Sequence, residues 1–212
     1  MMVHRQIVRR LLGLAVCLGL TGCAVSDPTQ YFTLAQVPAS TAERTATAST
    51  ADSSVGSASN VSIGVGPIVI PAYLDRRQIV IRTGTDQVEL SAFHRWAEPL
   101  EDGMARILSE EIAARVPTER VVTFPWRGVV ARAIQYQVVV TVVRFDGRPG
   151  GDVTLDTRWR ILDSHGEEQV FRRSTVIDTV KGQGHEPIVA AMTRALVSLG
   201  RELALEIRAL PH

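Results

Sequence analysis

The chain has 212 residues, of which 45% are hydrophobic, and its 23 basic and 22 acidic side chains leave a formal net charge of +1. This length suits one domain with a sizeable core, and the balanced charge excludes the basic surface on which nucleic-acid binding depends. The two cysteines, Cys17 and Cys23, lie close together near the start of the sequence, which leaves no disulfide or cysteine metal site for the rest of it.

The first residues have the pattern of a lipoprotein export signal. A short basic region ending at Arg10 precedes an apolar stretch over residues 11–20. About ten apolar residues suit the core of a signal peptide, whereas a membrane-spanning helix needs roughly 20. The motif Leu20-Thr21-Gly22-Cys23 is similar to the lipobox of bacterial lipoproteins, in which the cysteine is acylated. We expect a signal peptide over residues 1–22 and a lipid anchor at Cys23; the alternative is an ordinary cleaved signal with a chance cysteine.

The residue after the anchor bears on which membrane holds the protein. Lipoprotein sorting associates an aspartate at this position with retention in the inner membrane, and this chain has Ala24 instead. Several acyl chains on one cysteine hold a protein on a membrane where a single chain would not, because each buried methylene contributes about 0.8 kcal/mol. We therefore expect the chain to face the periplasm from the inner leaflet of the outer membrane.

Two organisations are open for the residues that follow the anchor. Residues 39–60 are almost entirely Ala, Ser, Thr and Gly, so they have too few large apolar groups to offset the entropy of ordering and should be disordered. The run Tyr31-Phe32-Thr33-Leu34-Ala35 has the composition of a strand. If it is one, residues 23–30 form the acylated tether and residues 31–212 the domain, with the disordered segment as an insertion. We favour this version over one in which all of 24–60 is tether.

Residues 61–70 predict the first long strand. Their apolar side chains alternate until Pro71 ends the pattern. Gly64 and Gly66 indicate a bulge or a close backbone approach near its middle. A phosphate-binding loop is a poor alternative, because a third glycine and a following helix are absent.

A hairpin and a helix are predicted next. Residues 78–82 and 88–90 are short strand-forming runs on either side of a turn that contains glycine. From residue 97 to residue 116, apolar side chains recur at spacings of three and four, which is typical of an amphipathic helix. Pro117 would end this helix.

The C-terminal half predicts more strands and a second helix. A short strand over 121–124 after a helix suggests a crossover unit, and three further strands over 136–145, 153–161 and 168–180 form an antiparallel meander. Residues 187–209 predict a second amphipathic helix. The expected fold class is α/β, a single domain with a mixed β-sheet, a C-terminal antiparallel meander and two principal amphipathic helices.

The sequence carries no recognisable catalytic or metal-binding motif. His94, His165 and His185 have no second histidine at metal-ligand spacing, so we interpret them as solvated or locally bonded side chains. A nucleophile elbow, a phosphate loop and a zinc-protease motif are all absent. We therefore expect no enzymatic activity, no cofactor and no metal.

Three stretches, taken with the lipobox, resemble a known family. They are Tyr31-Phe32-Thr33-Leu34, Pro71-Ala72-Tyr73-Leu74-Asp75-Arg76-Arg77-Gln78-Ile79-Val80 and Ala92-Phe93-His94-Arg95-Trp96-Ala97-Glu98-Pro99-Leu100. In this order they resemble the PqiC/YmbA family of ABC-type transport auxiliary lipoproteins, over most of the chain after the signal. The low-complexity insertion at 39–60 is the main departure from the family.

The resemblance implies a periplasmic domain on the outer membrane that serves an MCE-type system for moving phospholipid or other apolar molecules between membranes. Its partner would be an MCE-domain protein, whose far end it docks, and the resemblance also allows for a homo-oligomeric ring. The energy would come from an ABC ATPase elsewhere. Two rival functions remain open, a lipoprotein scaffold or activator of a cell-wall synthase and a lipid-binding shuttle.

Docking would need surface side chains that the fold does not require. Tyr, Trp and Arg are the residue types that most often anchor interfaces. On this basis the candidate partner-binding residues form two groups, Tyr73, Leu74, Arg76 and Arg77, and Arg95, Trp96 and Leu100. The alternatives are a plain polar connection in which Asp75 pairs with a neighbouring arginine, and a core position for Trp96 at the start of its helix.

Overall fold

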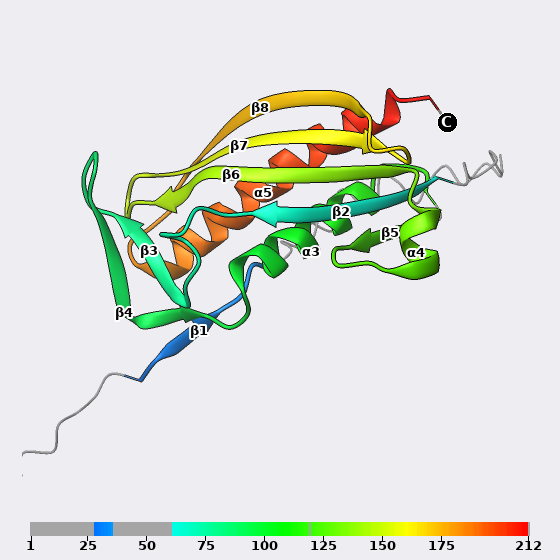
Figure 1. Ribbon diagram of the computed structural model, residues 1–212. Helices are drawn as coiled ribbons and strands as arrows, with labels where there is room; N and C mark the ends of the chain where they lie inside the picture. Colours follow the sequence, from blue (N-terminus) through cyan, green and yellow to red (C-terminus); the bar gives the residue numbers. More distant parts are fainter. Residues whose placement is uncertain (1–27, 36–60, 119, 212) are drawn as a thin grey trace, which may run out of the picture.

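The computed structural model describes residues 28–35, 61–118 and 120–211 (Figure 1). These residues form one mixed eight-stranded sheet and three helices, which confirms the predicted fold class. In chain order the elements are β1 (Gln30–Phe32), β2 (Ser62–Val69), β3 (Gln78–Arg82), β4 (Val88–Trp96), α3 (Leu100–Ala113), β5 (Arg120–Thr123), α4 (Gly128–Ala133), β6 (Tyr136–Gly147), β7 (Asp152–Asp163), β8 (Glu168–Thr179) and α5 (His185–Arg208). The expected anchor Cys23, the signal peptide and the segment 39–60 lie outside the described residues, so the domain boundaries remain predictions.

Strand β6 is the centre of the sheet. On one edge it pairs with β7 along its whole length, and β7 pairs in turn with β8, which gives the predicted antiparallel meander. On its other edge it pairs in parallel with β2, and β2 with β5, so the predicted crossover unit is also present. At its end β6 touches β3 through the single pair Ile81 and Gly147. Strands β3, β4 and β1 therefore form a small wing at one end of the sheet (Figure 1).

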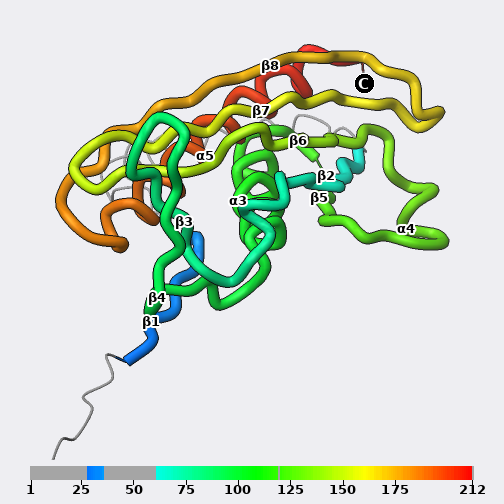
Figure 2. Tube along the Cα trace, turned by 60° about the vertical axis from the view of Figure 1, so that its left-hand side comes forward, coloured from blue at the N-terminus to red at the C-terminus, as the bar shows by residue number. Residues whose placement is uncertain are grey.

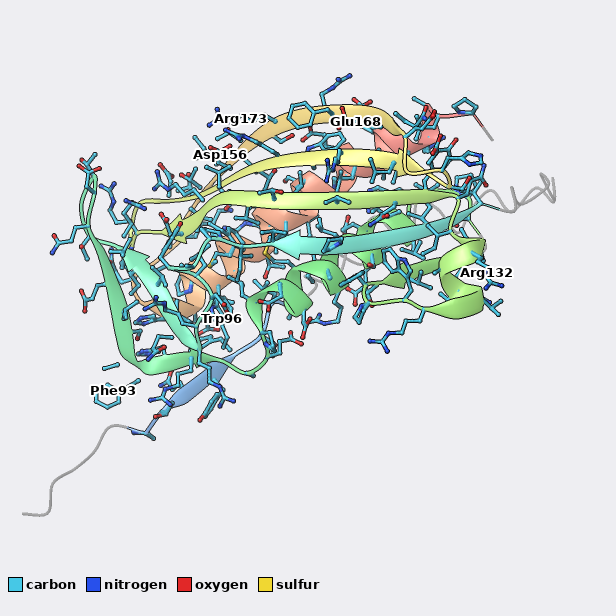
Figure 3. All side chains as sticks on the ribbon, in the orientation of Figure 1. Phe93, Trp96, Arg132, Asp156, Glu168 and Arg173 are labelled. Atoms are coloured by element: carbon cyan, nitrogen blue, oxygen red, sulfur yellow. The ribbon has the colours of Figure 1, made fainter. Side chains whose placement is uncertain are left out.

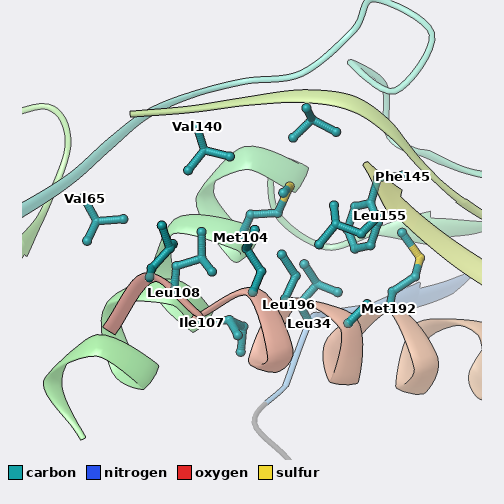
Figure 4. Close-up of a cluster of buried hydrophobic side chains, with 14 of the residues drawn as sticks. Leu34, Val65, Met104, Ile107, Leu108, Val140, Phe145, Leu155, Met192 and Leu196 are labelled. Carbon is teal, nitrogen blue, oxygen red and sulfur yellow. The ribbon is translucent and has the colours of Figure 1, made fainter. Parts of the chain in front are cut away.

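Helices α3 and α5 pack against each other and against the same face of the sheet (Figures 1 and 2). Their apolar positions, spaced by three and four residues, place Met104, Ile107 and Leu108 against Met192 and Leu196 in the core, as Figure 4 shows. Burying each large apolar side chain contributes about 1.5–3 kcal/mol. This shared layer fixes the wing relative to the sheet, because Leu34 beyond β1 and Ile79 of β3 belong to the same core.

The structure differs from the sequence predictions at three places. Strand β4 continues to Trp96 instead of ending at Leu90, because β1 pairs with its last residues, Gln30 opposite His94 and Phe32 opposite Trp96. The expected strand at 31–35 is confirmed only at Tyr31 and Phe32, because β1 begins one residue earlier and ends at Phe32. Helix α3 consequently begins at Leu100 and not at residue 97. Helix α4 was not predicted, since its six residues bury no side chain and so show no apolar period.

Candidate docking groove at the wing

The two predicted groups of docking residues meet at the wing. The backbone N–H of Trp96 donates a 2.7 Å hydrogen bond to the carbonyl of Arg77, which holds the end of β4 beside the loop that precedes β3. The two segments and β1 enclose a hollow of about 270 Å3, named here the docking groove. Its lining residues are Tyr31, Asp75, Arg76, Arg77, Trp96, Ala97, Glu98, Pro99, Leu100 and Glu101.

Three of the proposed docking residues do not lie on the surface. Leu74, Trp96 and Leu100 are 2%, 5% and 3% exposed, so the expectation that their side chains are free for a partner is wrong. Each is a large apolar group at a position that faces the layer under the wing, and burial there outweighs any benefit of exposure. Figure 3 shows the contrast on β4, where Trp96 lies within the wing and Phe93 points away from it. The core alternative for Trp96 therefore holds.

The remaining predicted residues differ in how free they are. Arg76 and Arg77 are exposed, and Arg76 reaches back only to the carbonyl of Ala72, at 3.4 Å. Arg95 is partly buried, and its Nε has no hydrogen-bond partner among the described residues. Within that part of the chain Asp75 forms no ion pair with a neighbouring arginine. The groove thus carries exposed charges of both signs.

Tyr73 ties the groove to the centre of the sheet. Its hydroxyl donates a 2.9 Å hydrogen bond to Oδ2 of Asp146, a fully buried carboxylate at the end of β6. Arg82 donates to both oxygens of this carboxylate, at 2.7 and 2.9 Å, and Arg144 donates to Oδ1 at 3.0 Å. The loop before β3 and the strand itself are thereby fixed to β6. Tyr73 serves this network and is not a free contact residue.

The hydrogen bonds at Asp146 also set its charge. Burial alone would raise the pKa of this carboxyl, but the hydrogen bonds from Arg82, Tyr73 and Arg144 outweigh it and lower the pKa below its usual range. Burial, followed by the charge of Asp146, raises the pKa of Tyr73 to about 12. The carboxylate is therefore ionised and the phenol neutral across the physiological range.

Other residues of the groove were not singled out in advance. Tyr31, which is 61% exposed, reaches the groove from β1, and the polar start of α3 adds Glu98 and Glu101. Tyr31 and Glu98 stand in stretches that carried the family resemblance. What the sequence could not show is the parallel pairing of β1 with β4, which brings Tyr31 opposite Arg95.

Two histidines that are far apart in sequence stack on each other. The rings of His94 on β4 and His185 at the start of α5 are nearly parallel, with centroids 3.5 Å apart, and Phe32 lies 5.8 Å from His94. The Nδ1 atom of His94 shares a 2.9 Å hydrogen bond with Ser91, whereas Nε2 of His185 has no partner among the described residues. The interpretation of His185 as solvated or locally bonded was wrong, because a long-range contact orders it.

This pair predicts a pH dependence of stability. Burial, then the positive charge of His94, lowers the pKa of His185, and Glu89 opposes this only partly. As the pH falls, His185 therefore binds a proton in the unfolded chain at a higher pH than in the folded protein. The free energy of unfolding should be unaffected above the usual histidine pKa of about 6.5 and should fall as the pH drops below it, by at most about 1.4 kcal/mol per pH unit for one proton.

Urea unfolding of the protein at a series of pH values between neutrality and pH 5 measures this loss. The variant His185→Phe keeps an aromatic ring in the stack and should flatten the dependence in that window. His165→Phe is the control, because His165 lies exposed in the turn between β7 and β8. An equal slope in the His185→Phe variant would show that other groups cause it.

The described residues contain no cluster of three or more His, Cys, Asp or Glu side chains that could hold a metal ion. Among the same residues, no helix combines the length and the apolar character needed to cross a membrane. The arrangement that the structure does provide is a shallow, charged groove with a rigid base. Such a surface is suited to binding another molecule through polar contacts.

Comparisons with known proteins add three findings. Residues 44–204 match the family model described as "ABC-type transport auxiliary lipoprotein component". The chain is 24% identical over 206 residues to the "Intermembrane transport lipoprotein PqiC" of Escherichia coli, with 96% of this chain and all of the relative covered. Two crystal structures share the fold: an uncharacterized protein with a TM-score of 0.66 and 20% identity, over 85% of this chain and 99% of that one, and a protein from Xanthomonas campestris with a TM-score of 0.57 and 18% identity, over 68% and 82%.

Proposed function

Because this chain belongs to the family of ABC-type transport auxiliary lipoprotein components, we propose that it docks the periplasm-spanning MCE protein of an intermembrane lipid transport system at the outer membrane. In this role it is a non-enzymatic subunit, held to the membrane through acylated Cys23. The ABC ATPase of the system supplies the energy elsewhere. The docking groove is the surface that receives the MCE protein.

The observation that carries this proposal is the position of the groove beside the chain's N-terminal strand. Tyr31 of β1 lines the groove, and Cys23 precedes Tyr31 by only eight positions. A fully extended chain of that length reaches at most about 29 Å. A lipid anchor at Cys23 therefore keeps the groove close to the membrane surface, where the far end of a spanning partner would arrive.

The chemistry of the groove favours a folded protein as the occupant over a lipid. Arg76 and Arg77 are exposed and stand among carboxylates of Asp75, Glu98 and Glu101. Arginine forms paired hydrogen bonds with carboxylates, and mixed charges at an interface set specificity and orientation. An acyl chain would gain little from such a lining, because its binding requires apolar walls.

Purification of the acylated protein from gently solubilised envelopes, followed by mass spectrometry, tests the proposal. We expect acyl chains on Cys23 and an MCE-domain protein among the proteins recovered. A cell-wall synthase in place of the MCE protein would support the scaffold or activator function instead. Bound phospholipid without any protein partner would support the shuttle.

The oligomeric state can be measured on the same material. The resemblance to the family allows a homo-oligomeric ring around the end of the MCE protein, and native mass spectrometry of the complex would give the number of copies. A ring places several docking grooves around one partner, so that individually weak polar contacts add up.

A further inference from the structure

The segment from β5 through α4 forms a projecting tip on the far side of the molecule from the wing. Figure 2 shows α4 and the loop before it standing out from the body. Helix α4 buries none of its residues. Three large apolar side chains are exposed there, Phe124 at 48%, Val129 at 80% and Val130 at 36%. This segment, residues 120–134, is named here the α4 tip.

The base of the α4 tip is fixed to the sheet. Trp126 packs over β2 at Gly64, so closely that a Cβ atom on that glycine would lie 2.8 Å from the indole ring. Phe124 meets the edge of the same indole, with ring centroids 5.3 Å apart, and Ile134 is 7% exposed. The exposed apolar groups are therefore held out in a defined position and do not fold back onto the core.

The α4 tip is also basic. Residues 120–134 contain Arg120, Arg127 and Arg132 and no acidic residue. None of the three arginines forms an ion pair within the part of the chain that the structure describes, and Arg132 points away from the body in Figure 3. Three acidic side chains nearby, Glu98, Asp102 and Glu110, line a hollow beside α3 together with Phe124, so the basic end is the α4 end.

We propose that the α4 tip binds the surface of an anionic bilayer, with Val129 and Val130 entering the headgroup region and Arg127 and Arg132 contacting lipid phosphates. An exposed apolar group flanked by unpaired cations is the combination that partitions into a negatively charged membrane interface. A protein partner would be expected to present carboxylates to these arginines, whereas lipid phosphate satisfies them and the bilayer also covers the valines.

The tip would give the lipid-anchored domain a second point of attachment. A tether alone lets the domain rotate over the membrane, whereas a tether and a tip together fix which face is turned to the periplasm. The proposal requires no protein partner, so it can fail or succeed independently of the docking groove.

The test uses the full mature lipoprotein, acylated at Cys23, with Val129→Cys labelled by an environment-sensitive fluorophore. The other cysteine of the mature sequence, Cys23, carries the acyl group and so offers no thiol for labelling. Reconstitution into vesicles of phosphatidylethanolamine and phosphatidylglycerol should shift the emission to the blue, and vesicles of phosphatidylcholine should give a smaller shift. Leu205→Cys on α5 is the matched control, because Leu205 is 67% exposed on another element, and its label should not shift.

The charge requirement is tested by adding Arg127→Glu and Arg132→Glu to the labelled protein. Both side chains are exposed, so the thermal unfolding midpoint should be unchanged while the blue shift in anionic vesicles is lost. The proposal is overturned if the Val129 label stays in water in anionic vesicles. It is equally overturned if the label shifts without vesicles on raising the protein concentration, which would indicate self-association, or shifts only when a protein partner is added.

Discussion

Asp146→Ala is expected to lower the free energy of unfolding by about 3–5 kcal/mol, the usual loss when one partner of a buried ion pair is removed. Asp146 is fully buried and accepts hydrogen bonds from Tyr73, Arg82 and Arg144. Without the carboxylate, the Arg82 guanidinium, whose side chain is only 14% exposed, is left beside a cavity with no counter-charge. The loss should extend to function, because this network holds the loop that carries Arg76 and Arg77.

Urea unfolding of the variant and the parent at neutral pH measures this effect. Asp156→Ala is the matched control, because Asp156 also pairs with an arginine, Arg173. This pair lies on the open face of the meander, where the Arg173 side chain is 60% exposed. Exposed pairs contribute about 0–1 kcal/mol. Similar losses in the two variants would contradict a special role for the buried network.

Arg76→Glu combined with Arg77→Glu is expected to abolish recovery of the MCE protein without unfolding the domain. Both side chains are exposed, so stability should change by about 0.5 kcal/mol or less. Like charges brought together across an interface cost several kcal/mol, which corresponds to a loss of affinity of about 100-fold or more. Co-purification from envelopes, scored against the amount of lipoprotein recovered, measures the loss.

The matched control for this pair is Arg158→Glu combined with Arg160→Glu. These two arginines are also exposed but lie on β7, away from the groove. Their reversal changes the net charge by the same amount and should leave the partner bound. Loss of the partner in both double variants would mean that total charge, and not the groove, controls docking. Tyr73 is unsuitable for such a test, because its substitution would also break the bond to Asp146.

Local pattern was enough to predict most of the fold. The β-branched and alternating residues of 136–145 and 153–161 specified the meander, and the three-and-four spacing specified both long helices. These signals are strong because one face of each element must be buried against a single core. The end of β4 was missed for the opposite reason: residues 91–96 become a strand through pairing with β1 and with Gln78 of β3, contacts that no local window contains.

The candidate site could be predicted only in part, because it also depends on contacts between segments that are far apart in the sequence. The motifs around Arg76 and Trp96 stand in two separate segments, and the structure brings these segments together through the hydrogen bond between Trp96 and Arg77. Composition could not separate an aromatic residue that anchors an interface from one that fills the core, and Trp96 proved to be core. The stack of His94 on His185 was out of reach, since it depends on how the wing meets α5.

Site-specific photocrosslinking in intact envelopes is the most direct test of the docking proposal. A photoreactive residue replaces Arg77 in the full lipoprotein, and a second protein carries it at Arg160 as the control. We expect a crosslink from position 77 to an MCE-domain protein and none from position 160. Crosslinks from position 77 to a cell-wall synthase, or to no protein at all while the lipoprotein is folded and acylated, would overturn the docking proposal.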